Sequence, residues 1–252
     1  MPAFVNSALR TLALAVGVAS VALAATAADI GVSPVAVHLD QANSRATVTV
    51  ANNGRAAVVM QAEVIEWKRL PDHQDADAPT TDMIVNPAVF SLEPGQSQVV
   101  RVGLRKAAHP DREGTYRVVL REVPMPPPLG ETRVSGQVRV LMALRVPIYV
   151  SPLNVVRDPR IHAVSHADGS IVANIRNDGN VHVRVGRLRV RAGDADPAAP
   201  AVSDQAVAEV VFPGESRQFK VGRIATHPGS SLRLELVTDQ GPFDVPVTLA
   251  RQ

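Results

Sequence analysis

The sequence predicts an all-β protein built from antiparallel β-sandwiches. Short segments rich in valine alternate apolar and polar residues, and turn-forming residues separate them at intervals of roughly 8–12 residues. Helical spacing, with apolar residues three and four positions apart, is hard to find anywhere in the chain. The chain has 252 residues, which leaves room for about two domains of roughly 100–200 residues each. We therefore predict two β-sandwich domains, one after the other.

The first domain is expected to contain a series of valine-rich strands. Turn formers such as Asn43-Ser44 and Asn52-Asn53-Gly54 separate the first of them. Residues 71–81 are rich in Asp, Pro and Thr and break the alternation, so we expect a solvated loop there. The strands are predicted at residues 32–40, 46–54, 56–67, 99–104, 115–123 and 132–152.

The segment Thr132 to Pro152 shows the clearest strand pattern. Every second residue from Val134 to Val146 is apolar or glycine, and polar residues fill the alternate positions in its first half. This period of two is typical of a strand with one apolar and one polar face. Later in the segment the alternate positions also become apolar, which indicates entry into a buried interior. Such a strand is either the last strand of a core or an edge strand available to another chain, and we interpret it as the second.

A second series of strands follows, so the domain boundary is expected near residues 151–160. Residues 170–190 are predicted to form a hairpin around Asn177-Asp178-Gly179-Asn180, because Asn and Gly readily adopt the backbone angles of tight turns. Further strands are expected at residues 206–222, with a turn at Pro213-Gly214, and at residues 231–249, with a turn at Asp239-Gln240-Gly241.

Residues 1–28 are predicted to be a secretory signal peptide. Arg10 is the only charged residue before Asp29, residues 11–25 are apolar, and small residues follow where a peptidase would cut. Cleavage after Ala27 or Ala28 fits equally well, and a retained N-terminal anchor is the alternative. We expect an exported protein without stable insertion in a membrane, and a bacterial periplasm suits such a chain without cysteine. The predicted units are therefore 1–28, 29–152 and 153–252.

Composition and motifs argue against several classes of function. The formal net charge is +2 and no block of Lys and Arg occurs, which argues against nucleic-acid binding. Without cysteine there is no disulfide, no Cys-based metal site and no Cys nucleophile. The histidines are scattered, and neither an HExxH nor a GxSxG motif is present. We therefore expect no enzyme activity, no catalytic residues, no metal site and no cofactor.

A set of short motifs, weak one by one, occurs in a specific order along the chain. The motifs are Asn52-Asn53, Gln61 with Trp67, Pro94-Gly95-Gln96, Val100-Arg101-Val102, Asp111-Arg112-Glu113 before Tyr116, residues 120–124 (LREVP) and residues 147–152 (PIYVSP). In this order and spacing they resemble those of the periplasmic pilus (fimbrial) chaperones, the PapD-like family, over essentially all of the mature chain. The resemblance implies two immunoglobulin-like β-sandwich domains arranged around an interdomain cleft.

The resemblance also implies a function. Members of this family lend a strand to a pilus subunit whose own fold lacks one, and pass the subunit to an outer-membrane usher. Here the lent strand would be Thr132 to Leu144, and burying each of its apolar side chains is worth about 1.5–3 kcal/mol. Pilus subunits and the usher are the expected partners, and self-association of the free form is another use of the same edge. The side chains expected to bind the subunit are Val134, Val138, Val140, Met142 and Leu144.

The chain departs from the family at the residues expected to bind the subunit's terminal carboxylate. Many members carry an Arg and a Lys for this purpose, and Ala36 and Pro147 stand at the two positions here. This is similar to divergent branches of the family. Arg101 and Arg145 are the nearest candidate replacements.

An ion pair between the two domains is also implied by the resemblance. It would use Glu113 and Asp239, but its basic partner falls at Ser151, so another residue is needed or the link is missing. An alternative reading of the whole chain is an exported immunoglobulin-like binding or structural module without strand donation. A hydrolase on a β-sandwich, with His and carboxylate side chains converging in one pocket, is a third.

Overall fold

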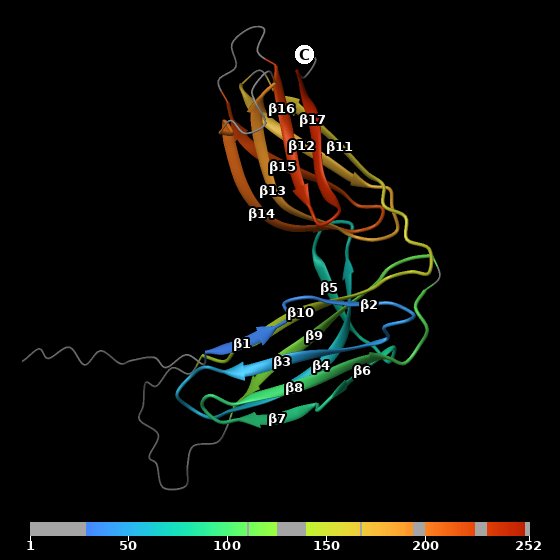
Figure 1. Ribbon diagram of the computed structural model, residues 1–252, viewed down its shortest axis with the longest axis vertical. Coiled ribbons are helices and arrows are strands. Elements are labelled where there is room, and N and C mark those ends of the chain that lie inside the picture. The colour runs from blue at the N-terminus through green and yellow to red at the C-terminus, as the bar shows by residue number, and fades with distance from the viewer. Residues whose placement is uncertain are drawn as a thin grey trace, which may run out of the picture. The chain divides into compact units, whose positions relative to one another are not determined.

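The computed structural model describes residues 29–109, 111–124, 140–166, 168–193, 200–224 and 231–249. Every regular element in these ranges is a β-strand, and they fall into two β-sandwiches (Figure 1). The described residues between 29 and 124 and between 141 and 249 belong to one compact unit. The predicted signal peptide, Val134 and Val138 lie outside the described residues. Within the described ranges, no helix is long and apolar enough to cross a membrane.

The N-terminal sandwich has two sheets that enclose one valine-rich core. One sheet has the order β1-β3-β8-β6, and the other has the order β2-β10-β9-β4-β5 with β7 paired to β4. The alternation seen in the sequence sends every second side chain inward, as Val48 and Val50 of β3 and Val100 and Val102 of β8 show. The strands are β1 (Ile30–Ser33), β2 (Val37–Leu39), β3 (Arg45–Asn52), β4 (Val58–Arg69), β5 (Asp75–Pro79), β6 (Met83–Asn86), β7 (Val89–Leu92), β8 (Ser97–Leu104), β9 (Gly114–Val123) and β10 (Ala143–Val150).

The C-terminal sandwich has its own core and a single strand order, β14-β13-β16-β17-β11-β12-β15. Its two edge strands lie beside each other, because Arg217 of β15 pairs with Glu209 of β14 at 3.0 Å and Ser203 Oγ donates to the Val221 carbonyl at 3.2 Å. The strands are β11 (Pro159–Ser165), β12 (Ser170–Asn177), β13 (Val183–Ala192), β14 (Ser203–Val211), β15 (Ser216–Arg223), β16 (Leu232–Thr238) and β17 (Gly241–Leu249).

The hairpin predicted over residues 170–190 is wrong in its pairing, although both strands exist. β12 pairs with β11 and β15, whereas β13 pairs with β14 and β16. The chain crosses the core between them. Asn177 explains the crossing, since its buried side chain donates to the carbonyls of Val181 (2.8 Å) and Val211 (3.0 Å) and accepts from the Gly179 amide (3.0 Å).

The N-terminal sandwich contains the same arrangement between β3 and β4. The buried Asn52 side chain donates to the carbonyls of Ala56 (2.8 Å) and Leu92 (3.0 Å) and accepts from the Gly54 amide (3.0 Å). An Asn-x-Gly sequence therefore serves in both domains to carry the chain from one side of the core to the other, with both hydrogen-bonding ends of the amide satisfied.

The prediction of a solvated loop at residues 71–81 is also wrong in part, because residues 75–79 form strand β5. This strand pairs with residues 65–69 of β4. Its carboxylates contact arginines of β4 and of β9, the next strand beyond it: Asp75 contacts Arg69 at 3.1 Å and Asp77 contacts Arg117 at 3.2 Å. Cross-strand ion pairs of this kind compensate for the low strand propensity of Asp.

Candidate functional site

The last strand of the N-terminal sandwich, β10, has one edge that is only partly covered. All of β10 pairs with β9, but on its other side only residues 148–150 pair, with the short strand β2. Among the described residues, positions 143–147 therefore have no strand on that side.

The backbone groups on this side can be assigned from the ladder. The Glu122 amide donates to the Met142 carbonyl at 2.9 Å, so Met142 points toward β9. Because successive residues of a strand alternate, the N–H and C=O groups of Ala143 and Arg145 point away from β9. Pro147 falls on the same outward side, where its missing N–H costs no ladder bond.

The side chains of β10 continue an apolar face beyond the core. Val146, Ile148 and Val150 are buried, and the half-buried Leu144 packs against the same core. Two residues further back, Met142 is half-buried and Val140 is 64% exposed. These three predicted binding side chains lie on described residues, Leu144 within β10 and Met142 and Val140 just before it.

Other strand edges among the described residues are short or charged. β1, β6 and β7 have four residues each, and β5 carries Asp75, Asp77 and Pro79. The edges of the C-terminal sandwich lie beside each other, as described above. Such features prevent unwanted pairing with other chains, and the open part of β10 has two of them, the charged Arg145 and Pro147.

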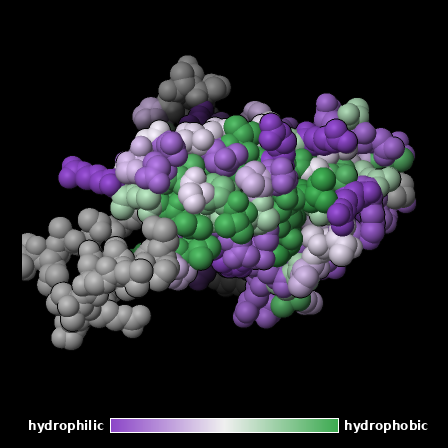
Figure 2. Space-filling model, turned by 90° about the horizontal axis from the view of Figure 1, so that it is seen from below, coloured by the Kyte–Doolittle hydropathy of each residue, from purple (hydrophilic) through white to green (hydrophobic). Residues whose placement is uncertain are grey.

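Exposed apolar side chains alone would not identify this site. Figure 2 shows hydrophobic residues gathered on one face of the molecule with hydrophilic residues around them. Large exposed hydrophobic residues also occur on other elements, including Ile84, Val89 and Val99. Ile84 and Val89 lie on the edge strands β6 and β7, which have only four residues each, whereas the unpaired stretch of β10 belongs to an eight-residue strand whose apolar face continues from the core.

Of the two candidate anchors, the structure places Arg145 at the open edge. Arg145 lies on the outer face of β10, where its Nε is 3.6 Å from Asp77 Oδ2. Arg101 lies on β8 in the other sheet, opposite Thr47 and Asn86. The two candidates are thus on different sheets.

Arg117 is a basic residue at this site that sequence reasoning missed. It lies opposite Pro147 on β9, and its guanidinium contacts Asp77 at 3.2 Å and covers the Trp67 ring at 3.8 Å. Burial alone would raise the pKa of Asp75, but hydrogen bonding to Arg117 and the nearby positive charges hold this pKa below its usual value. Only the register of β9 on β10 reveals Arg117, and this register cannot be read from local spacing.

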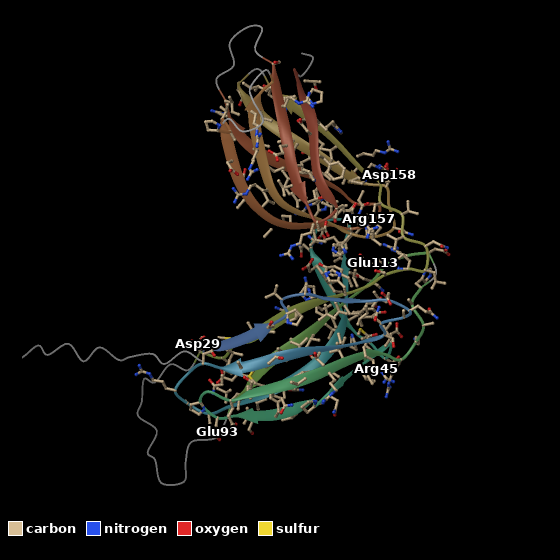
Figure 3. The ribbon with its side chains drawn as sticks, viewed as in Figure 1. Asp29, Arg45, Glu93, Glu113, Arg157 and Asp158 are labelled. Carbon is tan, nitrogen blue, oxygen red and sulfur yellow. The ribbon has the colours of Figure 1, made fainter. Side chains whose placement is uncertain are left out.

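The structure also brings Glu113 and Asp239 together, through a third residue that the sequence did not indicate. His182 Nδ1 lies 2.9 Å from both carboxylate oxygens of Glu113, and His182 Nε2 lies 3.4 Å from Asp239 Oδ2. Figure 3 labels Glu113, which precedes β9. Among the described residues, no group of three or more His, Cys, Asp or Glu side chains is arranged to hold a metal ion.

Comparison with known families gives a match to the N-terminal sandwich. Residues 29–156, about half of the chain, match the family described as "Pili and flagellar-assembly chaperone, PapD N-terminal domain". No curated protein sequence matches the chain.

Solved structures match both sandwiches. A chain in the complex of the chaperone CsuC with the tip adhesion subunit CsuE, from archaic chaperone-usher Csu pili of Acinetobacter baumannii, is 14% identical with a TM-score of 0.56. The match covers 88% of this chain and 100% of that one. The E. coli chaperone DraB is 18% identical over 88% of this chain and 97% of its own, with a TM-score of 0.55. A chain in the complex of the Salmonella enterica pilin SafA with the chaperone SafB is 18% identical over 86% and 95%, with a TM-score of 0.56. These likenesses show the fold.

Proposed function

Because the chain belongs to the PapD family of pilus and flagellar-assembly chaperones, which are not enzymes, we propose that it captures a pilus subunit in the periplasm through the open edge of β10. The observation that supports this most directly is the stretch of residues 143–147, which has a partner strand on one side only among the described residues. A subunit that lacks a strand has the complementary defect, namely an open groove with unpaired backbone groups on both sides.

Two kinds of interaction would hold the subunit. The outward N–H and C=O groups of Ala143 and Arg145 supply ladder bonds that do not depend on the subunit's sequence. Val140, Met142 and Leu144 supply apolar side chains, with Val134 and Val138 continuing the series outside the described residues. Each such side chain contributes about 1.5–3 kcal/mol when buried, before the cost of ordering the chain.

Release would follow from exchange of this strand for one that fits better. A neighbouring subunit can supply such a strand, so no nucleotide or cofactor is needed. We propose that the exchange occurs at an outer-membrane usher, to which the chaperone delivers its subunit, and that residues 1–28 export the chaperone as a signal peptide.

The first test replaces Val140 with aspartate. We expect the amount of complex with the subunit to fall by about 10- to 100-fold, because one buried valine is lost and a carboxylate would enter an apolar groove. The subunit is first identified as a small exported β-protein that co-purifies with the tagged chain from the periplasm of its own cells. Capture is then scored with that subunit co-expressed, as a complex on gel filtration.

Val89→Asp is the matched control for this test. Val89 is 60% exposed on β7, close to the 64% of Val140, but it lies away from the proposed strand. Equal capture by wild type and Val140→Asp would exclude the strand assignment. Equal loss in both variants would point to a general effect of surface charge, and absence of any captured subunit would favour a binding module without strand donation.

A second substitution tests the backbone directly. Ala143→Pro removes an N–H that points away from β9, so the sandwich keeps its own ladder while the incoming strand loses one hydrogen bond and meets the proline ring. We expect at least a roughly tenfold loss of capture with an unchanged circular dichroism spectrum. Ala143→Ser, which keeps the N–H, should bind as the wild type does; equal binding by the Pro and Ser variants would exclude pairing at this residue.

The two anchor candidates are separated by single alanine substitutions. We expect Arg145→Ala to weaken subunit binding by about tenfold, as for loss of one charge-assisted hydrogen bond, and Arg101→Ala to leave it unchanged. Affinity is measured by calorimetric competition with a peptide that carries the subunit's free C-terminal carboxylate. If Arg101→Ala weakened binding and Arg145→Ala did not, Arg101 on β8 would be the residue that binds the carboxylate.

A further inference from the structure

His182 has an unusual position for a histidine. Only 6% of its surface is exposed, and it lies in the C-terminal sandwich immediately before β13. Its Nδ1 contacts Glu113 of the N-terminal sandwich at 2.9 Å, and its Nε2 is 3.4 Å from Asp239 of the C-terminal sandwich. Glu113 is likewise buried, at 8% exposure. Both ring nitrogens therefore face carboxylates. A protonated imidazole can donate a hydrogen bond from each nitrogen, so it can bind both carboxylates at once.

The backbone around this cluster reinforces the contact between the two sandwiches. The His182 amide donates to Glu113 Oε2 at 2.9 Å, and the Glu113 amide donates to the Asn180 carbonyl at 3.0 Å. Asp239 Oδ1 accepts from the Arg184 amide at 2.8 Å. The carboxylates are thus held in place by backbone donors, and the imidazole fits between them.

Aromatic rings and two arginines lie around the imidazole. Tyr149 of β10 stacks on His182 with ring centroids 3.7 Å apart, and His38 of β2 lies at 6.1 Å in a parallel orientation. Burial, and then the nearby His182, lower the pKa of His38, so that ring is neutral at pH 7. Arg184 of β13 acts on both His38 and Tyr149, and Arg117 of β9 acts on Tyr149, so both cations lie near the cluster.

We propose that His182 is a proton-dependent clamp: its imidazolium, held between Glu113 and Asp239, couples the two sandwiches, and loss of its proton uncouples them. The neutral ring has one donor for two carboxylates, so deprotonation leaves one buried or half-buried carboxylate facing a lone pair.

The direction of the pH dependence follows from the same contacts. Burial alone would lower the pKa of His182, but hydrogen bonds to Asp239 and Glu113 and their negative charges raise it to about 9. The clamp is therefore closed at neutral pH and opens as the pH rises through about 9. Tyr149, which stacks on the ring, stays neutral there because burial and nearby Glu113 raise its pKa to about 12.

The absence of cysteine allows a direct measurement of the coupling. Cysteines introduced at the exposed positions Thr47 on β3 and Lys220 on β15 carry a donor and an acceptor dye, one in each sandwich, without competing thiols. Time-resolved energy transfer on the protein recovered from the periplasm is expected to give a narrow distance distribution at pH 7 that broadens with a midpoint near pH 9. In parallel, the Cε1 proton of His182, assigned by comparison with His182→Gln, should titrate with the same midpoint.

Variants of His182 separate charge from shape. His182→Gln should give the broad distribution already at pH 7, and His182→Lys, which keeps a positive charge, should restore the narrow one and hold it above pH 9. His73→Gln is the matched control, because His73 also pairs with a carboxylate of the other sandwich, Glu215 at 3.0 Å, but is 48% exposed. It should retain both the narrow distribution and the wild-type midpoint.

Several results would overturn the proposal. A His182 midpoint at or below that of free histidine, about 6.5, would show that the ring is neutral at pH 7. A distribution equally narrow at pH 7 and pH 10, or a loss of coupling in His73→Gln as large as in His182→Gln, would show that His182 does not control the junction. If His182→Gln does not fold, the energy-transfer measurement with the native His182 still decides the question, because it needs no resonance assignment.

Discussion

Replacing Asn177 with alanine is expected to lower the free energy of unfolding of the C-terminal sandwich by about 2–4 kcal/mol. The Asn177 side chain makes three hydrogen bonds where the chain crosses from β12 to β13. Alanine would leave the carbonyls of Val181 and Val211 with one partner fewer in a buried region, together with a small cavity. Urea unfolding followed by circular dichroism measures the change, and amide exchange assigns it to this sandwich.

Asn174→Ala provides the control for that measurement. Asn174 is on the same strand but is half-buried, with its side chain on the opposite side from the core residues Ala173 and Ile175. We expect a change within about 0.5 kcal/mol for this variant, as for ordinary surface substitutions. A similar loss in both variants would show that any asparagine on β12 contributes equally, contrary to the role given to the crossing.

The stability of the whole protein is expected to fall by about 3 kcal/mol as the pH rises from 6.5 to above 9. The folded state raises the pKa of His182 from 6.5 to about 9, so it binds a proton that the unfolded chain has already released over this interval. The stabilisation is complete below pH 6.5 and disappears as the pH passes about 9. Equilibrium urea unfolding at half-unit intervals of pH measures this slope.

His182→Gln should remove most of this slope while His73→Gln keeps it. Tyrosine ionisation does not interfere, because burial is the largest contribution that raises the pKa values of both Tyr116 and Tyr149 to about 12. At acidic pH, Asp239 has the opposite effect on stability: its contribution is lost as the pH falls. Its pKa is lowered from 3.8, because hydrogen bonds with His182 and with the Arg184 amide outweigh the effect of burial, so its contribution is lost only as the pH falls through that region. A flat profile between pH 6.5 and 9 would contradict the assigned charge of His182.

The sequence predicted the strands well, because alternation is a local property. Residues 46–54 and 115–123 were expected to be strands and correspond to β3 and β9. Which strands pair depends on residues far apart in the sequence, and the predicted pairing of residues 170–190 as a hairpin was wrong. Asn177-Asp178-Gly179 has the composition of a hairpin turn. In the structure, however, Asn177 donates hydrogen bonds to the buried carbonyls of Val181 and Val211, and the segment connects opposite sides of the core.

The candidate site was also predicted only where it depends on local sequence patterns. The apolar alternation from Val134 to Val146 is visible in the sequence, and its last residues belong to β10, which begins at Ala143. Glu113 and Asp239 were expected to share a contact on the basis of the family resemblance alone. His182 was not foreseen, because in the run VHVRV it occupies a strand-like position with no sign of its distant carboxylate partners.

The short strand β2 has a consequence for how a bound strand is positioned. It occupies residues 148–150 of the β10 edge, and the neighbouring Pro147 offers no N–H. A strand bound at this edge, as we propose for the subunit, would meet β2 at one end and could not slide along β10 toward the second sandwich. A shift by one residue would turn every side chain of the bound strand to the opposite face. We therefore expect β2 to limit the register of the bound strand independently of its sequence.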